Sequence, residues 1–197
     1  MAQSAAGLRM KAKLTSSVRV WDPLVRSLHW LLMIAIAGAW IMRHRAGAWH
    51  ERWGYVTAAV VLVRILWGFI GTSNARFASF VAGPRAVRAY LTAMLRGRAP
   101  RHVGHNPLGA LMIVAMLLNL ALICITGWMF GTDTFFGVAW VINTHLYATY
   151  ALFAMVALHL VGVLHACISQ RENLVAAMLH GRKRKAPSED AESQIQR

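Results

Sequence analysis

Four long apolar runs constrain this chain more than any other feature of its sequence. They cover about residues 21–42, 50–70, 108–130 and 138–168. Each is close to the roughly 20 residues that a helix needs to cross the hydrocarbon of a bilayer. The composition agrees, because only 14% of the residues are charged, against about 25% in soluble proteins. The sequence therefore predicts an all-α integral membrane protein built as a four-helix bundle.

The distribution of basic residues predicts how the bundle is oriented. Of the 21 Lys and Arg, seventeen lie in residues 1–26, 71–107 and 171–197, three lie in 43–52, and none lies in 131–140. By the positive-inside rule, both termini and the middle loop are expected on the cytoplasmic side. Because apolar runs divide the basic residues, they form no single patch of the kind that binds nucleic acid. We therefore expect the protein to contact membrane lipid and not to bind nucleic acid.

The chain divides into three parts. Residues 1–19 are expected to form a cytoplasmic tail, residues 20–170 the four-helix membrane domain, and residues 171–197 a basic cytoplasmic tail. The last part has no apolar face from Gly181 onward, and such a segment is expected to be disordered.

The middle loop contains a short amphipathic segment. Pro84 suits the start of a helix and Gly97 its end. Between them lies a set of apolar residues that share one helical face opposite Arg85 and Arg88: Val87, Tyr90, Leu91, Met94 and Leu95. This pattern predicts a short helix on the cytoplasmic membrane surface, with its basic residues toward lipid headgroups.

Four of the nine histidines fall within or at the mouth of an apolar run, where a polar side chain is costly unless it has a partner. They are His29, His50, His145 and His159. His44, His102, His105, His165 and His180 lie near predicted loops and interfaces, where water can solvate them. A lone histidine in a membrane helix is more often a hydrogen-bonding residue than a ligand. Four of them at matched depths favour ligands.

Helix geometry pairs the four histidines. His145 and His159 are 14 residues apart, which brings both to nearly the same helix face, about 21 Å apart along the axis. The predicted topology places His145 toward the outer side and His159 toward the cytoplasm. His50 lies at the outer level and His29 at the cytoplasmic level. Depth therefore pairs His50 with His145 and His29 with His159.

Two pairs of neutral imidazoles suit iron porphyrin. Each pair can occupy both axial positions of one flat ring, and the apolar helix faces can cover the rest. Zinc is disfavoured, because the pairs are too far apart to form one tetrahedral site. No C-x-x-C-H motif occurs, which excludes covalent attachment of the haem. Two haem b groups without an open coordination position favour electron transfer.

Two arginines and several glycines are candidates for contact with such a cofactor. Arg26 and Arg64 could neutralise the haem propionates, or could instead snorkel and anchor helix ends. Five glycines lie within or beside the apolar runs, at positions 38, 54, 68, 109 and 127. Small residues of this kind either let bulky rings approach the backbone or simply let membrane helices pack closely.

Several short motifs occur in an order typical of one family. VWDPLVRSLHW surrounds His29, HERWGY and VRILWGF lie in the second apolar run, and ARFASFVAGPRAV and GHNPLG lie in the middle loop. The fourth run carries two histidines with 13 residues between them and is followed by RENLVAAMLHGRKR. Over about residues 19–185 the chain resembles the bacterial di-haem cytochrome b family. That family includes cytochrome b561 and the membrane subunits of nickel-iron hydrogenases, formate dehydrogenases and thiosulfate reductases.

The resemblance implies that His29, His50, His145 and His159 are the haem axial ligands, in agreement with the depth argument. It also implies quinone or quinol as a membrane partner, and multi-pass insertion in the bacterial cytoplasmic membrane as part of a respiratory chain. No iron-sulfur, nickel, flavin or molybdenum motif occurs in the sequence. Any catalytic redox partner is therefore expected to be a separate protein, and the chain's homo- or hetero-oligomeric state stays open.

Three functions remain open from the sequence. The favoured one is an electron-transfer subunit that exchanges electrons between the quinone pool and an outer-face redox protein, namely a dehydrogenase, a hydrogenase or a c-type cytochrome. The alternative is a self-contained superoxide:quinone oxidoreductase of the cytochrome b561 type. The cationic residues near His50 suit both functions, because they would steer a small anion or dock an acidic protein: Arg43, His44, Arg45 and Arg52. The third is a haem-free scaffold protein.

Overall fold

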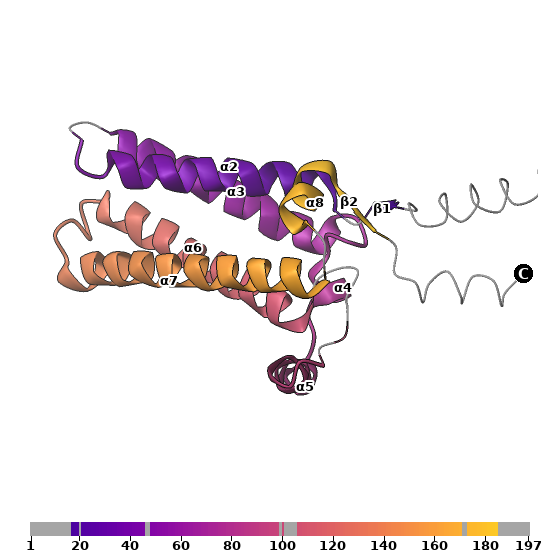
Figure 1. The fold of residues 1–197 in the computed structure, drawn as a ribbon. Coiled ribbons are helices and arrows are strands. Elements are labelled where there is room, and N and C mark those ends of the chain that lie inside the picture. The colour runs from indigo at the N-terminus through magenta and orange to yellow at the C-terminus, as the bar shows by residue number, and fades with distance from the viewer. Residues whose placement is uncertain are drawn as a thin grey trace, which may run out of the picture.

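The computed structural model describes residues 17–19, 21–45, 48–98, 100, 106–170 and 173–184. Four long helices dominate this part of the chain and form two antiparallel hairpins (Figure 1). The helices are α2 (Pro23–Met42), α3 (Trp49–Ile70), α6 (Pro107–Phe130) and α7 (Ala139–Gln170). Each is long and apolar enough to cross a membrane, and each begins and ends within two residues of its predicted run. The predicted four-helix membrane bundle is confirmed.

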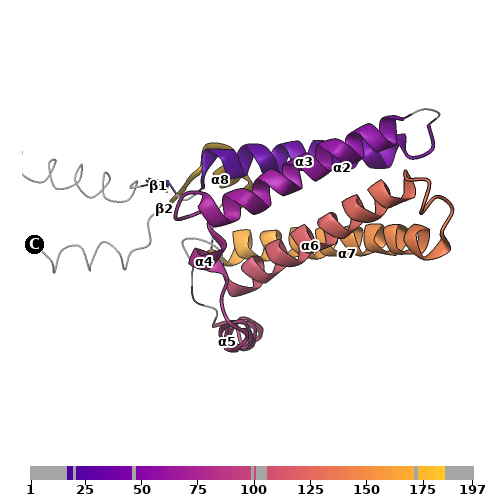
Figure 2. The ribbon, with the colours of Figure 1, turned by 180° about the vertical axis from the view of Figure 1, so that it is seen from behind.

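The two ends of the bundle differ. Two short connections, after α2 and after α6, lie at one end, which we call the loop end (Figure 1). All other described elements gather at the opposite end, which we call the tail end, and the view from behind shows the same division (Figure 2). These elements are α4 (Phe77–Phe80), α5 (Pro84–Leu95), α8 (Leu174–His180), β1 (Ser17–Arg19) and β2 (Arg182–Arg184).

The two helices that leave the tail end begin in the same way. Asp22 caps α2, since its Oδ1 accepts hydrogen bonds from the backbone N–H groups of Leu24 and Val25. Asn106 caps α6 and accepts a hydrogen bond from the N–H of Gly109. In both helices proline follows the cap, where its missing N–H costs nothing.

Asp22 also ties α2 to the end of α3. Its second oxygen, Oδ2, accepts a hydrogen bond of 2.7 Å from the hydroxyl of Thr72. Burial alone would raise the pKa of the Asp22 carboxyl, but the hydrogen bonds from Thr72 and from the backbone outweigh burial and hold this pKa below its usual value. The cap therefore remains an acceptor at neutral pH.

The two hairpins meet mainly through α3 and α6. Val61 of α3, Leu120 of α6 and Leu152 of α7 form the buried centre of this contact. On the other side of the bundle, Trp40 of α2 meets Phe153 of α7 edge to face, with ring centres 4.6 Å apart. The core therefore lies at mid-depth, with polar groups toward both ends.

Two glycines admit aromatic rings of the protein itself. A Cβ at Gly38 of α2 would come within 2.6 Å of the Trp53 ring of α3. A Cβ at Gly68 would clash more severely with the ring of Phe77, which docks α4 on α3. At these two positions, close approach by a ring is the reason for glycine, and the ring belongs to a side chain.

A small β ribbon joins the two chain segments that flank the bundle. β1 pairs antiparallel with β2, with Ser17 opposite Arg184 and Arg19 opposite Arg182. The prediction that the chain is disordered from Gly181 onward is wrong for residues 182–184. The physical reason is Gly181, whose φ of +77° reverses the chain after α8, while its carbonyl accepts a hydrogen bond from the N–H of Trp21. The rest of that tail lies outside the described residues.

The predicted amphipathic helix is present as α5. It begins at Pro84 and is followed by Gly97, which has a φ of +67°. Figure 1 shows α5 end-on while the four long helices run across the view, so its axis crosses theirs at the side of the tail end. Tyr90 is buried, whereas Leu95 is 77% exposed, as expected for a helix whose apolar face is shared between protein and lipid.

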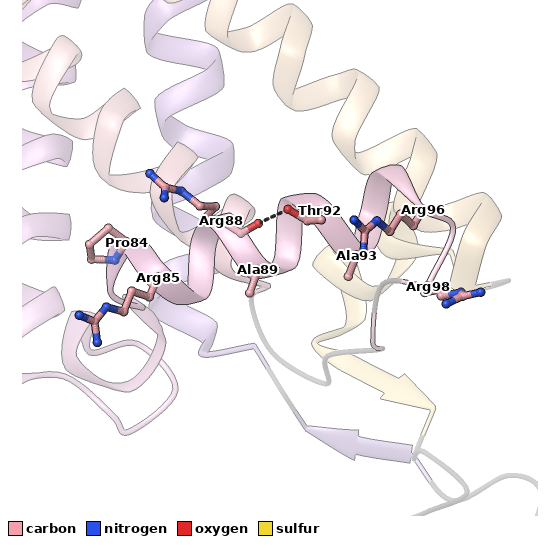
Figure 3. Close-up of a pocket in the computed structure, with 8 residues that line it drawn as sticks. All are labelled: Pro84, Arg85, Arg88, Ala89, Thr92, Ala93, Arg96 and Arg98. Atoms are coloured by element: carbon pink, nitrogen blue, oxygen red, sulfur yellow. Dashed lines mark hydrogen bonds between the residues drawn. The ribbon is translucent and has the colours of Figure 1, made fainter.

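The opposite side of α5 is basic. Figure 3 shows a shallow groove along this face, where the guanidinium groups of Arg85, Arg88, Arg96 and Arg98 project from the helix and the loop that follows it. All four arginines are exposed. A helix of this kind, with arginines on one side and exposed leucines on the other, suits the boundary between headgroups and hydrocarbon.

Candidate functional site

The four singled-out histidines lie at two levels of the bundle. His50, near the start of α3, and His145, near the start of α7, lie toward the loop end. His29 of α2 and His159 of α7 lie toward the tail end. Three of the other five, His44, His165 and His180, are exposed, and the remaining two, His102 and His105, fall outside the described residues. The two levels match the depth argument made from the sequence.

The loop-end histidines face each other across the two hairpins. The ring centres of His50 and His145 are 6.2 Å apart, and the ring planes meet at 77°. His50 is exposed and His145 is half-buried. The sequence-based pairing of these two residues therefore corresponds to a direct juxtaposition of their imidazoles.

Each loop-end imidazole is held by a backbone carbonyl of the neighbouring helix. Nδ1 of His50 lies 2.8 Å from the carbonyl oxygen of Ala39 in α2, and Nδ1 of His145 lies 3.0 Å from that of Ile123 in α6. A carbonyl oxygen can only accept, so each Nδ1 must carry the proton and donate it. Nε2 of each ring then keeps its lone pair, as a metal-binding imidazole requires.

The spacing of this pair fits one metal ion between two axial imidazoles. A metal–imidazole bond is about 2.0 Å long and the ring centre lies about 1.2 Å behind the bonded nitrogen, so two ligands on opposite sides put their ring centres about 6.4 Å apart. The observed separation is 6.2 Å. Among the described residues no three His, Cys, Asp or Glu gather around one point. This pair therefore offers two imidazole nitrogens to such an ion.

The tail-end pair is less completely supported by hydrogen bonds. His29 and His159 lie close enough to interact electrostatically. Nδ1 of His29 is buried and has no hydrogen-bond partner within the described ranges. An apolar interior rarely leaves a buried polar atom unsatisfied, so this nitrogen marks a place where a polar group is to be expected.

Arg64 adds a buried cation at the tail end. It lies 14 residues after His50 on α3, the same spacing that separates the two histidines of α7, so it lies about 21 Å along the helix from His50. Its side chain is only 8% exposed, and its guanidinium carbon lies 5.1 Å from the centre of the Phe77 ring. Its Nη1 finds no acceptor among the described residues, although Asp22 attracts it electrostatically.

Arg26 has a different environment. Its Nη1 donates to the carbonyl of Leu179 at the end of α8, and the guanidinium lies against Gly181, where a Cβ would come within 3.1 Å of it. Its buried Nε has no acceptor in the described part of the chain. Arg26 therefore anchors α8 to α2 and retains one free donor.

The loop end carries cations beside His50. The guanidinium of Arg43 lies 3.7 Å from the centre of the Trp40 ring, and that of Arg52 lies 4.8 Å from the centre of the Trp49 ring. Arg45 is exposed nearby in sequence. Such stacking holds a guanidinium in place without neutralising it, so the surface around the exposed His50 is positively charged.

Sequence reasoning missed the groups that hold the loop-end rings. These are the carbonyls of Ala39 and Ile123, together with the hydroxyl of Thr126, whose Oγ1 lies 3.2 Å from Nδ1 of His145. Every residue has a backbone carbonyl, so the sequence cannot show which carbonyl accepts a hydrogen bond from a histidine. Thr126 could have been noticed only as a hydroxyl on an apolar helix, which usually bonds to its own backbone.

The comparison with known families agrees with this geometry. The family described as prokaryotic cytochrome b561 matches residues 20–181, which include all four long helices, both histidine pairs and Arg64. No curated protein and no solved structure matches the chain significantly. The family match covers well over half of the chain. The chain therefore belongs to the prokaryotic cytochrome b561 family, multi-pass membrane proteins that transfer electrons through b-type haem.

Proposed function

We propose that this cytochrome holds two b-type haems and carries electrons across the bilayer between the quinone pool and a redox protein at the outer face. One haem lies between His50 and His145 and the other between His29 and His159. The observation that carries this proposal is the pair of loop-end imidazoles, 6.2 Å apart and each fixed through Nδ1.

The chemistry of the ligands favours electron transfer. A bound haem supplies an iron that changes between ferric and ferrous states. With an imidazole on each side of the ring, the protein leaves no open position for a substrate. The N–H groups of His50 and His145 donate to carbonyls, which orients the rings and increases the electron density on the ligating nitrogens.

Two levels of histidine allow electrons to cross in steps. His145 and His159 lie about 21 Å apart along α7 by helix rise, and the edges of two large rings would be closer than their centres. Trp40 and Phe153 pack against each other between α2 and α7, where their apolar rings help to exclude water from the path.

Charge supports the orientation of the bundle. Among the described residues, the tail end carries more basic residues than the loop end, including the four arginines of the groove on α5 (Figure 3), so we assign it to the cytoplasmic side of the bacterial inner membrane. Anionic lipid headgroups are the natural partners of these arginines. The loop end then faces outward with the cations that surround His50.

Arg64 is the best candidate to neutralise a haem propionate. It is buried, lies at the level of the tail-end histidines, and has a donor without a partner among the described residues. A buried cation of this kind is costly unless an anion lies nearby. Arg26 is the second candidate, through its Nε, which has no acceptor among the residues that the structure describes, although its other contacts hold it against α8.

The outer partner is proposed from the charge around His50. Arg43 and Arg52 are held in place on Trp40 and Trp49, and such a surface suits an acidic docking protein. The same cations would also attract a small anion. The alternative function, superoxide:quinone oxidoreductase activity by the chain alone, therefore rests on the same residues.

An electron-transfer assay in oriented liposomes tests the proposed function. We expect quinol in the membrane to reduce both haems, and ferricyanide added at the loop end to reoxidise them. Failure of quinol to reduce either haem would contradict the proposal. Superoxide generated at the loop end provides the second arm of the assay. Rapid quinone reduction by the purified chain, slowed by Arg43→Glu and Arg52→Glu, would favour the alternative function.

Replacement of single histidines tests the ligand pairs. We expect His50→Ala and His145→Ala each to lower the haem content from two to one per chain and to leave the same haem behind, because the two variants empty the same site. His29→Ala and His159→Ala should leave the other haem. His165→Ala, which alters an exposed histidine outside both pairs, should retain two. The pairing is refuted if folded His50→Ala and His145→Ala proteins retain different haems.

Replacement of Arg64 tests the propionate contact. Arg64→Gln removes a buried positive charge, so the ferric haem beside it becomes relatively more stable. We expect the midpoint potential of the tail-end haem to fall and that of the loop-end haem to stay unchanged in a redox titration. Arg76→Gln, an exposed arginine at the same end, is the control. A shift confined to the loop-end haem would contradict this assignment.

A further inference from the structure

The imidazole of His145 makes a second polar contact on α6. Its Nδ1 lies 3.2 Å from Oγ1 of Thr126, in addition to the carbonyl of Ile123. The Thr126 hydroxyl has one proton, which it can give to the carbonyl of Leu122 at 2.7 Å or of Ile123 at 3.1 Å. Its oxygen lone pairs then accept from the N–H of His145. The imidazole proton is thus shared between two acceptors.

The next residue on α6 makes room for the ring. A Cβ at Gly127 would come within 3.1 Å of Cε1 and 3.4 Å of Nδ1 of His145. Contacts this short force the neighbour to shift by a few tenths of an ångström. The neighbour here is an aromatic ring on the rigid helix α7, and a shift away from α6 lengthens its hydrogen bonds to Ile123 and Thr126.

The buried state of Thr126 makes this contact well defined. Its side chain is only 2% exposed, so water does not compete for the hydroxyl. A threonine hydroxyl in a helix is already satisfied when it donates a hydrogen bond to a backbone carbonyl of its own helix. Thr126 has that carbonyl and also faces the imidazole of another helix.

We propose that Thr126 and Gly127 are positioning residues that fix the tautomer and the position of the His145 imidazole. By acting on this ligand, they lower the redox potential of the loop-end haem. The inference rests on the proposed function, because it requires haem at the His50–His145 pair. A ligating imidazole whose N–H is well bonded is a stronger electron donor to the metal, which stabilises ferric over ferrous iron. Loss of the contact therefore raises the potential.

Threonine variants test the hydroxyl. Thr126→Val keeps the shape of the side chain and removes the acceptor, and we expect a higher midpoint potential for the loop-end haem alone, with two haems retained. Thr126→Ser restores the hydroxyl and should restore the wild-type potential. The control is Thr149→Val, because the Thr149 hydroxyl bonds to the backbone carbonyl of His145 and not to its ring. The loop-end haem is identified as the one that His50→Ala loses.

Glycine variants test the space beside the ring. Gly127→Ala should raise the same potential and change the low-spin electron paramagnetic resonance signal of the loop-end ferric haem. Gly162→Ala is the matched control, because no described atom outside the local helix backbone lies within 4 Å of a Cβ at this position. In this variant the loop-end haem should titrate as in the wild-type protein.

The possible results separate this inference from the proposed function. Wild-type potentials in both Thr126→Val and Gly127→Ala would overturn the inference, as would equal effects of Thr126→Ser and Thr126→Val. Selective loss of the loop-end haem in Thr126→Val, with rescue by serine, would support it. If His145→Ala retained both haems, the proposed ligand itself would fail, whatever the threonine variants show.

Discussion

The rest of the structure depends on one arrangement: two imidazoles at the loop end, each fixed by the backbone of a neighbouring helix. Ala39 of α2 orients His50 of α3, and Ile123 of α6 orients His145 of α7. The two rings face each other across the hairpins, so all four membrane helices meet in one polar contact. In a bilayer such a contact is costly unless every donor is satisfied or serves a ligand, and here the N–H groups are satisfied while the lone pairs remain available.

The two ends of the bundle differ in how their buried polar groups are satisfied. At the loop end the protein itself supplies acceptors for the histidine N–H groups. At the tail end a buried donor of Arg64, Nη1, has no acceptor in the described ranges, which is the pattern expected where the cofactor supplies the anion. Under the proposed two-haem assignment, bonded imidazoles would favour ferric iron at the loop end and the buried cation would favour ferrous iron at the tail end.

Much of this was predictable because membrane helices follow simple rules. Length and hydropathy predicted the four helices within two residues, Pro84 and Gly97 predicted the bounds of α5, and a spacing of 14 residues predicted the two histidine levels. The ribbon between β1 and β2 was missed, because it depends on Gly181 reversing the chain toward Trp21, which local pattern does not reveal. The roles of Gly38 and Gly127 also could not be predicted from their positions in the sequence. A tryptophan ring packs against Gly38 and a histidine ring against Gly127.

The most direct test of the account is the number of haems in the purified protein. A pyridine haemochrome assay, combined with a reduced-minus-oxidised spectrum and an accurate protein concentration, measures b-type haem per chain. The two proposed ligand pairs, His50 with His145 and His29 with His159, predict two haem b groups per chain, both low-spin. A folded protein that binds only one haem, or none, would contradict the central claim that each pair holds its own iron.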